Sequence, residues 1–296
     1  MNINMKYYIV TICAIFIALG VGILVGFNLN YDQALSKQQS EVLESFNAEF
    51  DTLKEKNKNL QQELNNLNGN LEDIKLYVDS NINALTENVL TDKNTGIILT
   101  SENNDYSEDI EKIITDANGT LAFNILIKDN INEEEKLTEL SKELNKTFKT
   151  SEDVIKYIVS SLNSTKGYEQ LYALENLGVI KINNIDENKY QDFDSVVLLG
   201  ELTGDDEKDL KEKFATKEKL IIDNLKELNK YLVAATQKDS PIDILKLYSQ
   251  NDISTIDNIN EGIGKVSLTT LLKNQNMVGN YGESEVAKEI IAYKNN

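Results

Sequence analysis

The residues from Tyr7 to Phe27 form a run of 21 residues without a charged side chain, YYIVTICAIFIALGVGILVGF. As a helix, a run of this length crosses about 30 Å of hydrocarbon. Lys6 precedes the run and Asp32 is the first charged residue after it, so the positive-inside rule predicts a cytoplasmic tail at residues 1–6. The sequence therefore predicts one plasma-membrane span at residues 7–27, with the remainder of the chain outside the cytoplasm.

A cleaved signal peptide is the alternative interpretation of this run, because Ala18-Leu19-Gly20 has the form of a small-x-small cleavage site. The apolar run continues well past that point, which favours a retained helix. Gly22 and Gly26 have the four-residue spacing that lets two membrane helices approach closely, although glycine is also tolerated where a helix faces lipid. We predict that these two glycines contribute to a dimer.

Between Leu43 and Leu85, apolar residues return at alternating steps of three and four. Placed in a heptad frame, the a and d positions are Leu43, Phe46, Phe50, Leu53, Asn57, Leu60, Leu64, Leu67, Leu71, Ile74, Val78, Asn81 and Leu85. Eleven of these thirteen residues are apolar, and a two-residue seam held for six heptads is typical of a left-handed coiled coil. A helix packed on a globular domain usually has a broader apolar face. We therefore predict a coiled-coil stalk at residues 28–90.

Asn57 occupies an a position of this seam, where a buried amide costs stability but favours a parallel, in-register dimer. Glu49 at g and Lys54 at the following e have the charges that such a pairing requires. Two membrane helices that enter from the same side also require a parallel arrangement. The predicted partner of the stalk is therefore a second copy of this chain, as a parallel homodimer.

Residues 91–296 show short apolar runs alternating with helical stretches, which is typical of βαβ units. The predicted strands are 96–100, 121–127, 195–199 and 231–235, and the predicted helices are 106–117, 133–147, 151–163, 167–177, 205–229 and one from Pro241 to Tyr248. The sequence predicts an α/β domain with a mainly parallel sheet and helices on both faces.

The charge and composition exclude several functions. The chain has 30 basic and 49 acidic side chains, for a net charge of -19, so nucleic acid is not an expected partner. Histidine is absent, and Cys13, the single cysteine, lies in the predicted membrane span. Histidine-based triads and cysteine nucleophiles are therefore excluded, and we predict neither a catalytic residue, a metal site nor a cofactor.

Two local motifs partly match known ligand-binding loops but lack residues that those loops require. Gly262-Ile263-Gly264-Lys265-Val266-Ser267 resembles a phosphate-binding loop, but Val266 stands where the metal-binding Ser or Thr is needed. A calcium loop starting at Asp257 fails because Ile259 and Leu268 take ligand positions. Asp192 and Asp194 are interpreted as a solvated loop, and Asp205-Asp206-Glu207 as a helix N-terminus.

Three stretches of the chain carry a family resemblance. They are YYIVTICAIFIALGVGILVG at residues 7–26, Val196-Val197-Leu198-Leu199-Gly200, and Ser254-Thr255-Ile256-Asp257-Asn258 followed by Gly264-Lys265-Val266 and Gly279-Asn280-Tyr281-Gly282. Together they resemble the copper transport outer-membrane protein family of the MctB type. The resemblance implies a membrane segment, a coiled coil, an extracytoplasmic α/β domain and a role in copper transport or copper homeostasis. Copper prefers thiolate, thioether and imidazole ligands, and beyond the membrane this chain offers Met277 alone, which argues against direct copper ligation.

Two functions from different classes follow. The first is a non-enzymatic cell-envelope protein that acts as a dimeric scaffold or binding module and contacts other envelope proteins. Because ligands of parallel sheets bind at the carboxyl ends of strands, the predicted recognition surface consists of Thr255, Asp257, Gly264, Lys265, Gly279, Tyr281 and Gly282. In a purely structural interpretation, Asp257 caps a helix near Asn260 and the glycines form a tight turn. The second function is a carboxylate-dependent hydrolase of envelope polymers; a pore is a third and would require a larger oligomer.

Overall fold

The computed structural model describes residues 5–202 and 204–293, with the side chains of residues 29–34 excepted. The predicted cytoplasmic tail at residues 1–6 therefore falls largely outside the described residues, as does the side chain of Asp32. The chain divides into two compact units, residues 1–71 and residues 72–296. The second of these is called the distal unit below.

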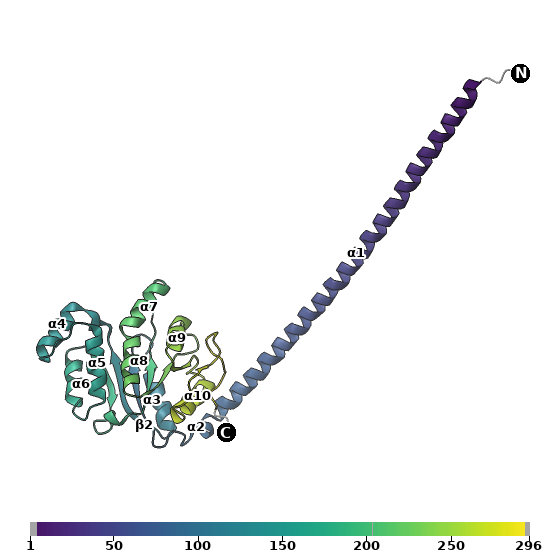
Figure 1. The fold of residues 1–296 in the computed structure, drawn as a ribbon. Helices are drawn as coiled ribbons and strands as arrows, with labels where there is room; N and C mark the ends of the chain where they lie inside the picture. The colour runs from purple at the N-terminus through teal and green to yellow at the C-terminus, as the bar shows by residue number, and fades with distance from the viewer. Residues whose placement is uncertain (1–4, 203, 294–296) are drawn as a thin grey trace. The chain divides into compact units, whose positions relative to one another are not determined.

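A 76-residue helix, α1 (Met5–Ser80), contains the predicted membrane span and most of the predicted stalk (Figure 1). Within the described residues, one helical segment is long and apolar enough to cross a membrane, Met5–Asn28, with a mean hydropathy of 2.8. Helical structure at this segment satisfies every backbone polar group internally, as a hydrocarbon environment requires. The length and the composition of the predicted span are thus confirmed.

The apolar residues of the predicted seam lie exposed along α1. Seven of them, Leu43, Phe46, Phe50, Leu53, Leu60, Leu64 and Leu67, are each 54–66% exposed. A helix gains stability in water mainly when its apolar stripe is buried. In the single chain this stripe is not buried against any other element that the structure describes. The coiled coil itself stays a prediction.

α1 ends at Ser80 rather than continuing towards residue 90, and a short helix, α2 (Ile82–Thr86), follows. The last heptad of the predicted seam is therefore interrupted. Val78 is buried within the distal unit, and the amide of Asn81 donates to the carbonyl oxygen of Tyr77 at 2.8 Å, which satisfies one carbonyl at the helix end. Packing of this last turn within the distal unit accounts for the earlier end of the helix.

The described part of the distal unit contains a seven-stranded sheet in the order β3-β2-β1-β4-β5-β6-β7. Its strands are β1 (Asn94–Leu99), β2 (Thr120–Ile127), β3 (Ile180–Ile185), β4 (Ser195–Leu199), β5 (Tyr231–Ala235), β6 (Ser254–Ile256) and β7 (Asn280–Tyr281). All neighbouring strands pair in parallel except β2 and β3, which are antiparallel. The predicted mainly parallel α/β domain is confirmed.

Helices cover both faces of this sheet (Figure 1). They are α3 (Ser107–Asp116), α4 (Glu134–Glu143), α5 (Ser151–Leu162), α6 (Tyr168–Asn176), α7 (Glu207–Thr216), α8 (Glu218–Glu227), α9 (Ile242–Ser249) and α10 (Gly262–Lys273), with short 3-10 turns η1 (Asp129–Asn132) and η2 (Tyr190–Asp192). Side chains alternate along each strand: Ile98 joins the core with α5 and α8, whereas Ile97 and Leu99 join the core with α3 and α10. Burial on both faces explains why the central strands β4 and β5 are almost entirely apolar.

The structure departs from the predicted elements at three places. The predicted helix at 205–229 is broken at Lys217, whose φ of -139° is not helical, into α7 and α8. The antiparallel strand β3 and the short strands β6 and β7 were not predicted, whereas the helix considered near Asn260 corresponds to α10, which begins at Gly262. The predicted segment Gly279–Gly282 contains β7, so it is an edge strand and its flanks rather than a simple loop.

We expect Gly96→Ala to lower the free energy of unfolding of the distal unit by about 1–3 kcal/mol, because overpacking a tight core forces neighbours to shift. A Cβ at this position of β1 would overlap the ring of the buried Phe123. Thermal unfolding followed by near-ultraviolet circular dichroism measures the effect. Gly69→Ala, on α1 with nothing within 4 Å of its Cβ, is the control and should not destabilise the unit; equal effects would contradict the packing argument.

Candidate functional site

The order of the strands creates a switch point between β1 and β4. After β1 the chain adds β2 on one side, and later it adds β4 on the other side. In open parallel sheets the loops diverge at such a point and leave a crevice beyond the carboxyl ends of the two strands. Here β1 and β4 end at Leu99 and Leu199, which are paired in register, and the backbone N–H of Thr100 donates to the carbonyl oxygen of Leu199.

A cleft of about 340 Å³ lies at this switch point and is called the switch-point cleft below. Its lining comes from the ends of β1 and β4, from η1 and from the junction of α7 and α8. The residues are Thr100, Ser101, Asn103, Asp129, Asn132, Glu201, Leu202, Lys213, Thr216, Lys217 and Glu218. Ten of these eleven side chains are polar, so the cleft suits a polar ligand.

Lys217 lies at the break between α7 and α8 and lines the switch-point cleft. Its side chain is almost completely buried, and its ammonium group donates to the carbonyl oxygen of Thr100 and to Oδ1 of Asp129, the latter at 2.6 Å. The buried charge is thus paired, as burial of an ammonium group requires. These contacts join the end of β1 to η1 and explain the break between α7 and α8.

Glu218, the first residue of α8, is 1% exposed, and neither of its carboxylate oxygens has a hydrogen-bond partner. Burial raises the pKa of this carboxyl to about 7, against the lowering effects of the Lys217 ammonium and the nearby Thr100 hydroxyl. The Thr100 hydroxyl also lacks a partner that meets hydrogen-bond geometry. Tyr248 lies close by, fully buried, and its hydroxyl is likewise unpartnered. Such groups are rare in folded proteins.

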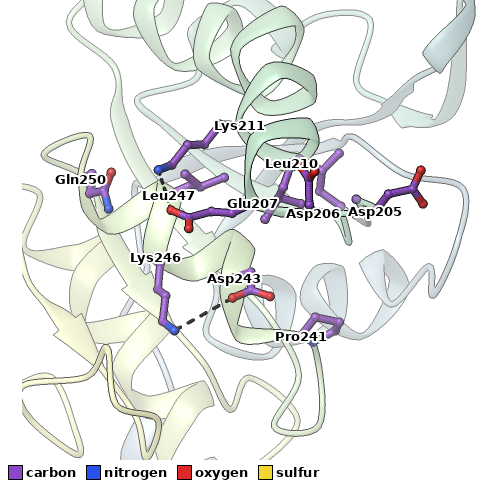
Figure 2. A pocket seen from close by; sticks show the side chains of 12 residues that line it. Asp205, Asp206, Glu207, Leu210, Lys211, Pro241, Asp243, Lys246, Leu247 and Gln250 are labelled. Atoms are coloured by element: carbon purple, nitrogen blue, oxygen red, sulfur yellow. Dashed lines mark hydrogen bonds and ion pairs between the residues drawn. The ribbon is translucent and has the colours of Figure 1, made fainter.

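A second cleft, of about 580 Å³, lies between α7 and α9 (Figure 2). Its carboxylates are largely paired with lysines: Glu207 with Lys211 at 2.6 Å, and Asp243 with Lys246 at 4.0 Å. Lys211 holds the pKa of Glu207 below its usual value. The Asp206 carboxylate accepts from the backbone N–H of Asp209, which confirms the helix N-terminus predicted for this acidic run. Exposed ion pairs of this kind contribute little stability.

The predicted recognition residues gather around the pairing of β6 with β7. The backbone N–H of Thr255 donates to the carbonyl oxygen of Gly279, and its hydroxyl donates to Asn280 at 2.9 Å. Tyr281 pairs with Ile256 and is buried, which raises the pKa of its phenol. The polar atoms of Thr255 are therefore hydrogen-bonded within the chain and are not free for a partner.

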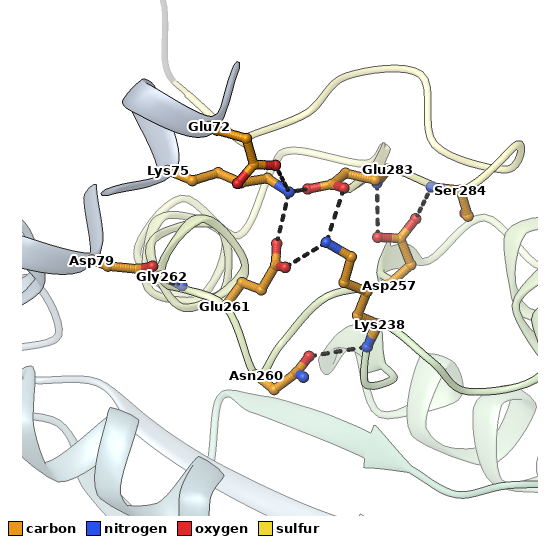
Figure 3. Close-up of polar contacts among 10 residues, drawn as sticks. All are labelled: Glu72, Lys75, Asp79, Lys238, Asp257, Asn260, Glu261, Gly262, Glu283 and Ser284. Carbon is orange, nitrogen blue, oxygen red and sulfur yellow. Dashed lines mark hydrogen bonds and ion pairs between the residues drawn. The ribbon is translucent and has the colours of Figure 1, made fainter. Parts of the chain in front are cut away.

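Asp257 follows β6 directly, and its carboxylate accepts from the backbone N–H groups of Glu283 at 2.9 Å and Ser284 at 2.6 Å (Figure 3). It does not cap a helix: α10 begins later, at Gly262. Gly282 has a φ of +133°, and a Cβ there would overlap the Asp257 carboxylate, so this turn requires glycine. The interpretation of Asp257 as a helix cap was wrong because its partners lie far along the sequence.

Gly264 and Lys265 lie on α10, away from this turn. A Cβ at Gly264 would overlap the carbonyl of Asn258, so glycine permits a close approach of backbone to backbone. Lys265 is partly exposed on the same helix.

The residues predicted to contribute to dimerisation, Gly22, Gly26 and Asn57, are all exposed on α1, where the glycines have nothing within 4 Å of a Cβ. The dimerisation predicted for these three residues stays a prediction.

A cluster of charges that sequence reasoning missed lies next to the Asp257 turn (Figure 3). The buried ammonium of Lys75, in the last turns of α1, pairs with Glu283 and with Glu261 at 3.5 Å. Lys238 pairs with the same two carboxylates at 3.3 Å and 2.6 Å. Burial raises the pKa of Glu283, but Lys75 and Lys238 together hold it below its usual value.

Asp79, one turn after Lys75, accepts from the backbone N–H of Gly262 at 2.8 Å, at the start of α10. A carboxylate at the N-terminus of a helix accepts from a backbone N–H that has no partner within the helix, and its negative charge interacts favourably with the helix dipole. The members of this cluster are distant in the sequence, and no local pattern links them. Lys75, Lys238, Glu261 and Glu283 each have at least one oppositely charged partner, which indicates a structural role for the cluster.

Comparison with known proteins identifies a family. A family model described as "Copper transport outer membrane protein, MctB" matches residues 2–292, nearly the whole chain. No curated protein matches the chain.

We expect the free energy of unfolding to fall as the pH rises from about 4.5 to about 7, because the folded state holds the Glu218 proton more tightly than the unfolded state does. Glu218→Gln removes this dependence and should make the protein more stable at pH 8 by on the order of 3 kcal/mol. Unfolding measured at several pH values tests this. Glu227→Gln, at the exposed end of the same helix, is the control, and parallel curves for Glu218→Gln and the unmodified chain would refute the expectation.

We expect Asp257→Ala to destabilise the distal unit by about 1–3 kcal/mol, because two backbone N–H groups lose a charged acceptor. Hydrogen exchange should accelerate at Glu283 and Ser284. Asp257→Asn retains one acceptor oxygen and should have a smaller effect. Unchanged exchange at both residues in the alanine variant would show that the turn does not depend on this carboxylate.

Proposed function

The chain belongs to the MctB family of copper transport outer membrane proteins, and we propose that it acts as a membrane-anchored, dimeric envelope scaffold. Its apolar N-terminal helix is the anchor, the rest of α1 is the stalk, and the distal unit is the binding module. The observation that carries the proposal is the stripe of exposed apolar residues along α1. That stripe has no occupant in a single chain and repeats with the period of a two-stranded coiled coil.

The proposed occupant of the stripe is a second copy of this chain in parallel register. Asn57 at an a position favours two strands over higher oligomers, and Glu49 and Lys54 have complementary charge at g and e. Gly22 and Gly26 lie on the same helix and permit close contact of two membrane segments. Each of these features requires the two chains to run in the same direction.

We propose that the distal unit lies outside the cytoplasm and meets other envelope proteins there. Lys6 before the membrane segment and the acidic chain after it agree with this orientation. The net charge of -19 disfavours nucleic acid as a partner. In this role the stalk sets the distance from the membrane and the distal unit supplies the recognition surface.

Copper, the cargo named in the family description, does not fit the side chains of this chain as a tightly bound ligand. Cys13 and Met5 lie in the apolar helix, and Met277 packs against the core of the distal unit. Among the described residues no three His, Cys, Asp or Glu side chains are close enough to hold a metal ion. A role in copper handling would therefore operate through a partner protein and not through ligation by this chain.

The hydrolase alternative has weaker support. The switch-point cleft does contain the carboxylates of Asp129, Glu201 and Glu218. However, Asp129 is paired with the buried Lys217 ammonium. Glycoside hydrolysis requires two carboxylates that flank the bond to be cleaved. A single buried carboxyl beside a paired lysine suits binding better, so the scaffold remains the proposed function.

We expect a disulfide-linked dimer when Leu60→Cys, at a d position, is placed in a Cys13→Ser background and oxidised in membranes. Facing d residues of a parallel coiled coil lie close together, whereas Gln62 at f faces away, so Gln62→Cys is the matched control. Non-reducing electrophoresis measures the product. Equal cross-linking at both positions, or none at Leu60→Cys, would contradict the parallel dimer.

We expect the purified full-length chain to bind Cu(I) no more tightly than its Met277→Leu variant when titrated against a competing chelator. The reason is the lack of soft ligands beyond the membrane. Stoichiometric binding that survives a strong chelator would overturn the ligand argument and make direct copper handling the leading function.

A further inference from the structure

At the switch-point cleft, three buried oxygen atoms lack a partner at good hydrogen-bond geometry, and the Thr100 hydroxyl lies beside both the Glu218 carboxyl and the Tyr248 phenol. The three atoms are the two carboxylate oxygens of Glu218 and the hydroxyl oxygen of Thr100. Both residues line the cleft and both are nearly completely buried. Leaving such groups without partners costs free energy, and native proteins seldom retain them without a functional reason.

We propose that the switch-point cleft binds a small, neutral, polyhydroxylated ligand such as a monosaccharide, whose hydroxyl groups donate to Glu218 and Thr100. This assigns a ligand class to the binding module and does not depend on dimerisation of the stalk. The position agrees with the general placement of ligands at switch points of parallel sheets. The volume of about 340 Å³ limits the ligand to a small molecule.

The floor of the cleft is held in place by contacts from three directions. The Lys217 ammonium binds the carbonyl oxygen of Thr100 and the carboxylate of Asp129. A Cβ at Gly200 would overlap the Thr100 hydroxyl, so the end of β4 approaches the end of β1 closely. These contacts fix the backbone at Thr100, so little backbone ordering is needed on binding.

The charges around the cleft argue for a neutral ligand. Most charged groups of the lining are already paired within the chain: Lys217 with Asp129, Lys213 with Asp209, and Glu201 as the acceptor from Asn104 and Ser240. An anion would meet the buried carboxyl of Glu218, and an ammonium group would meet the buried ammonium of Lys217. A hydroxyl group avoids both conflicts because it donates to the carboxylate and also accepts from a neighbouring donor.

The rim of the cleft matches the same ligand class. Ser101, Asn103, Asn132 and Thr216 present hydroxyl and amide groups that both donate and accept hydrogen bonds. Leu202 is the one apolar side chain in the lining. A ligand with several hydroxyl groups would use this arrangement, whereas a hydrophobic ligand would leave the polar lining unsatisfied.

The test uses the full-length chain in phosphatidylcholine nanodiscs, free of sugar-based detergent, with glucose and N-acetylglucosamine as probes. Saturation-transfer difference NMR should detect at least one of them at millimolar concentration. At pH 8, above the Glu218 pKa of about 7, Glu218→Gln should weaken that binding at least about tenfold, because hydrogen bonds to an ionised carboxylate are roughly twice as strong as neutral ones. Glu207→Gln, in the other cleft, should bind as the unmodified chain does.

Thr100→Val supplies a second variant that keeps the side-chain volume and removes an unpartnered hydroxyl, so it should fold normally and bind more weakly. No saturation transfer with either sugar, or equal transfer in Glu218→Gln, would overturn the proposal. Binding of ethanolamine in place of both sugars would overturn the neutral ligand class. The cross-linking of Leu60→Cys reports on the scaffold separately, so the two proposals fail by different measurements.

Discussion

Parallel pairing is the constraint on which the distal unit depends. Because β1, β2, β4, β5 and β6 run in the same direction, their carboxyl ends meet at one edge of the sheet. The switch-point cleft, the cleft between α7 and α9 and the Asp257 turn all lie beyond strand ends at that edge. Polar groups concentrate there because the faces of a parallel sheet are covered by helices and are apolar.

The two buried lysines Lys75 and Lys217 lie in different electrostatic surroundings. Lys75 lies among carboxylates from distant parts of the sequence, and its neighbours Glu261, Glu283 and Lys238 are paired with one another in turn. Lys217 is also paired, but the adjacent Glu218 is not. A network of paired charges stabilises the fold. An unpaired buried carboxyl beside a cleft indicates a group that can bind a ligand.

Sequence reasoning succeeded where a pattern is local. The strands at 195–199 and 231–235 were predicted with their observed bounds, because continuous apolar runs bounded by polar residues are a strong signal. The strand β3 was missed because polar residues interrupt its isoleucines, and β7 is too short to produce a pattern. Thr255, Asp257 and Gly282 lie around the pairing of β6 with β7, but the partners of the Asp257 carboxylate are distant in the sequence, so no local pattern predicts them. Nothing near Lys217 signals a helix break: its cause is the contact with Thr100 and Asp129, which only the tertiary fold creates.

The contacts at the end of α1 have a mechanical consequence. The helix that contains the membrane segment is held in the distal unit by the Asp79 contact with Gly262 and by the ion pairs of Lys75. The chain then continues through α2 to β1, the strand that pairs with both β2 and β4. Tension along the chain would therefore load these polar contacts before it reached the centre of the sheet. A few polar contacts at the margin of a unit open at a lower free energy than a core strand does, so they would yield first and would protect the sheet against a pull on α1.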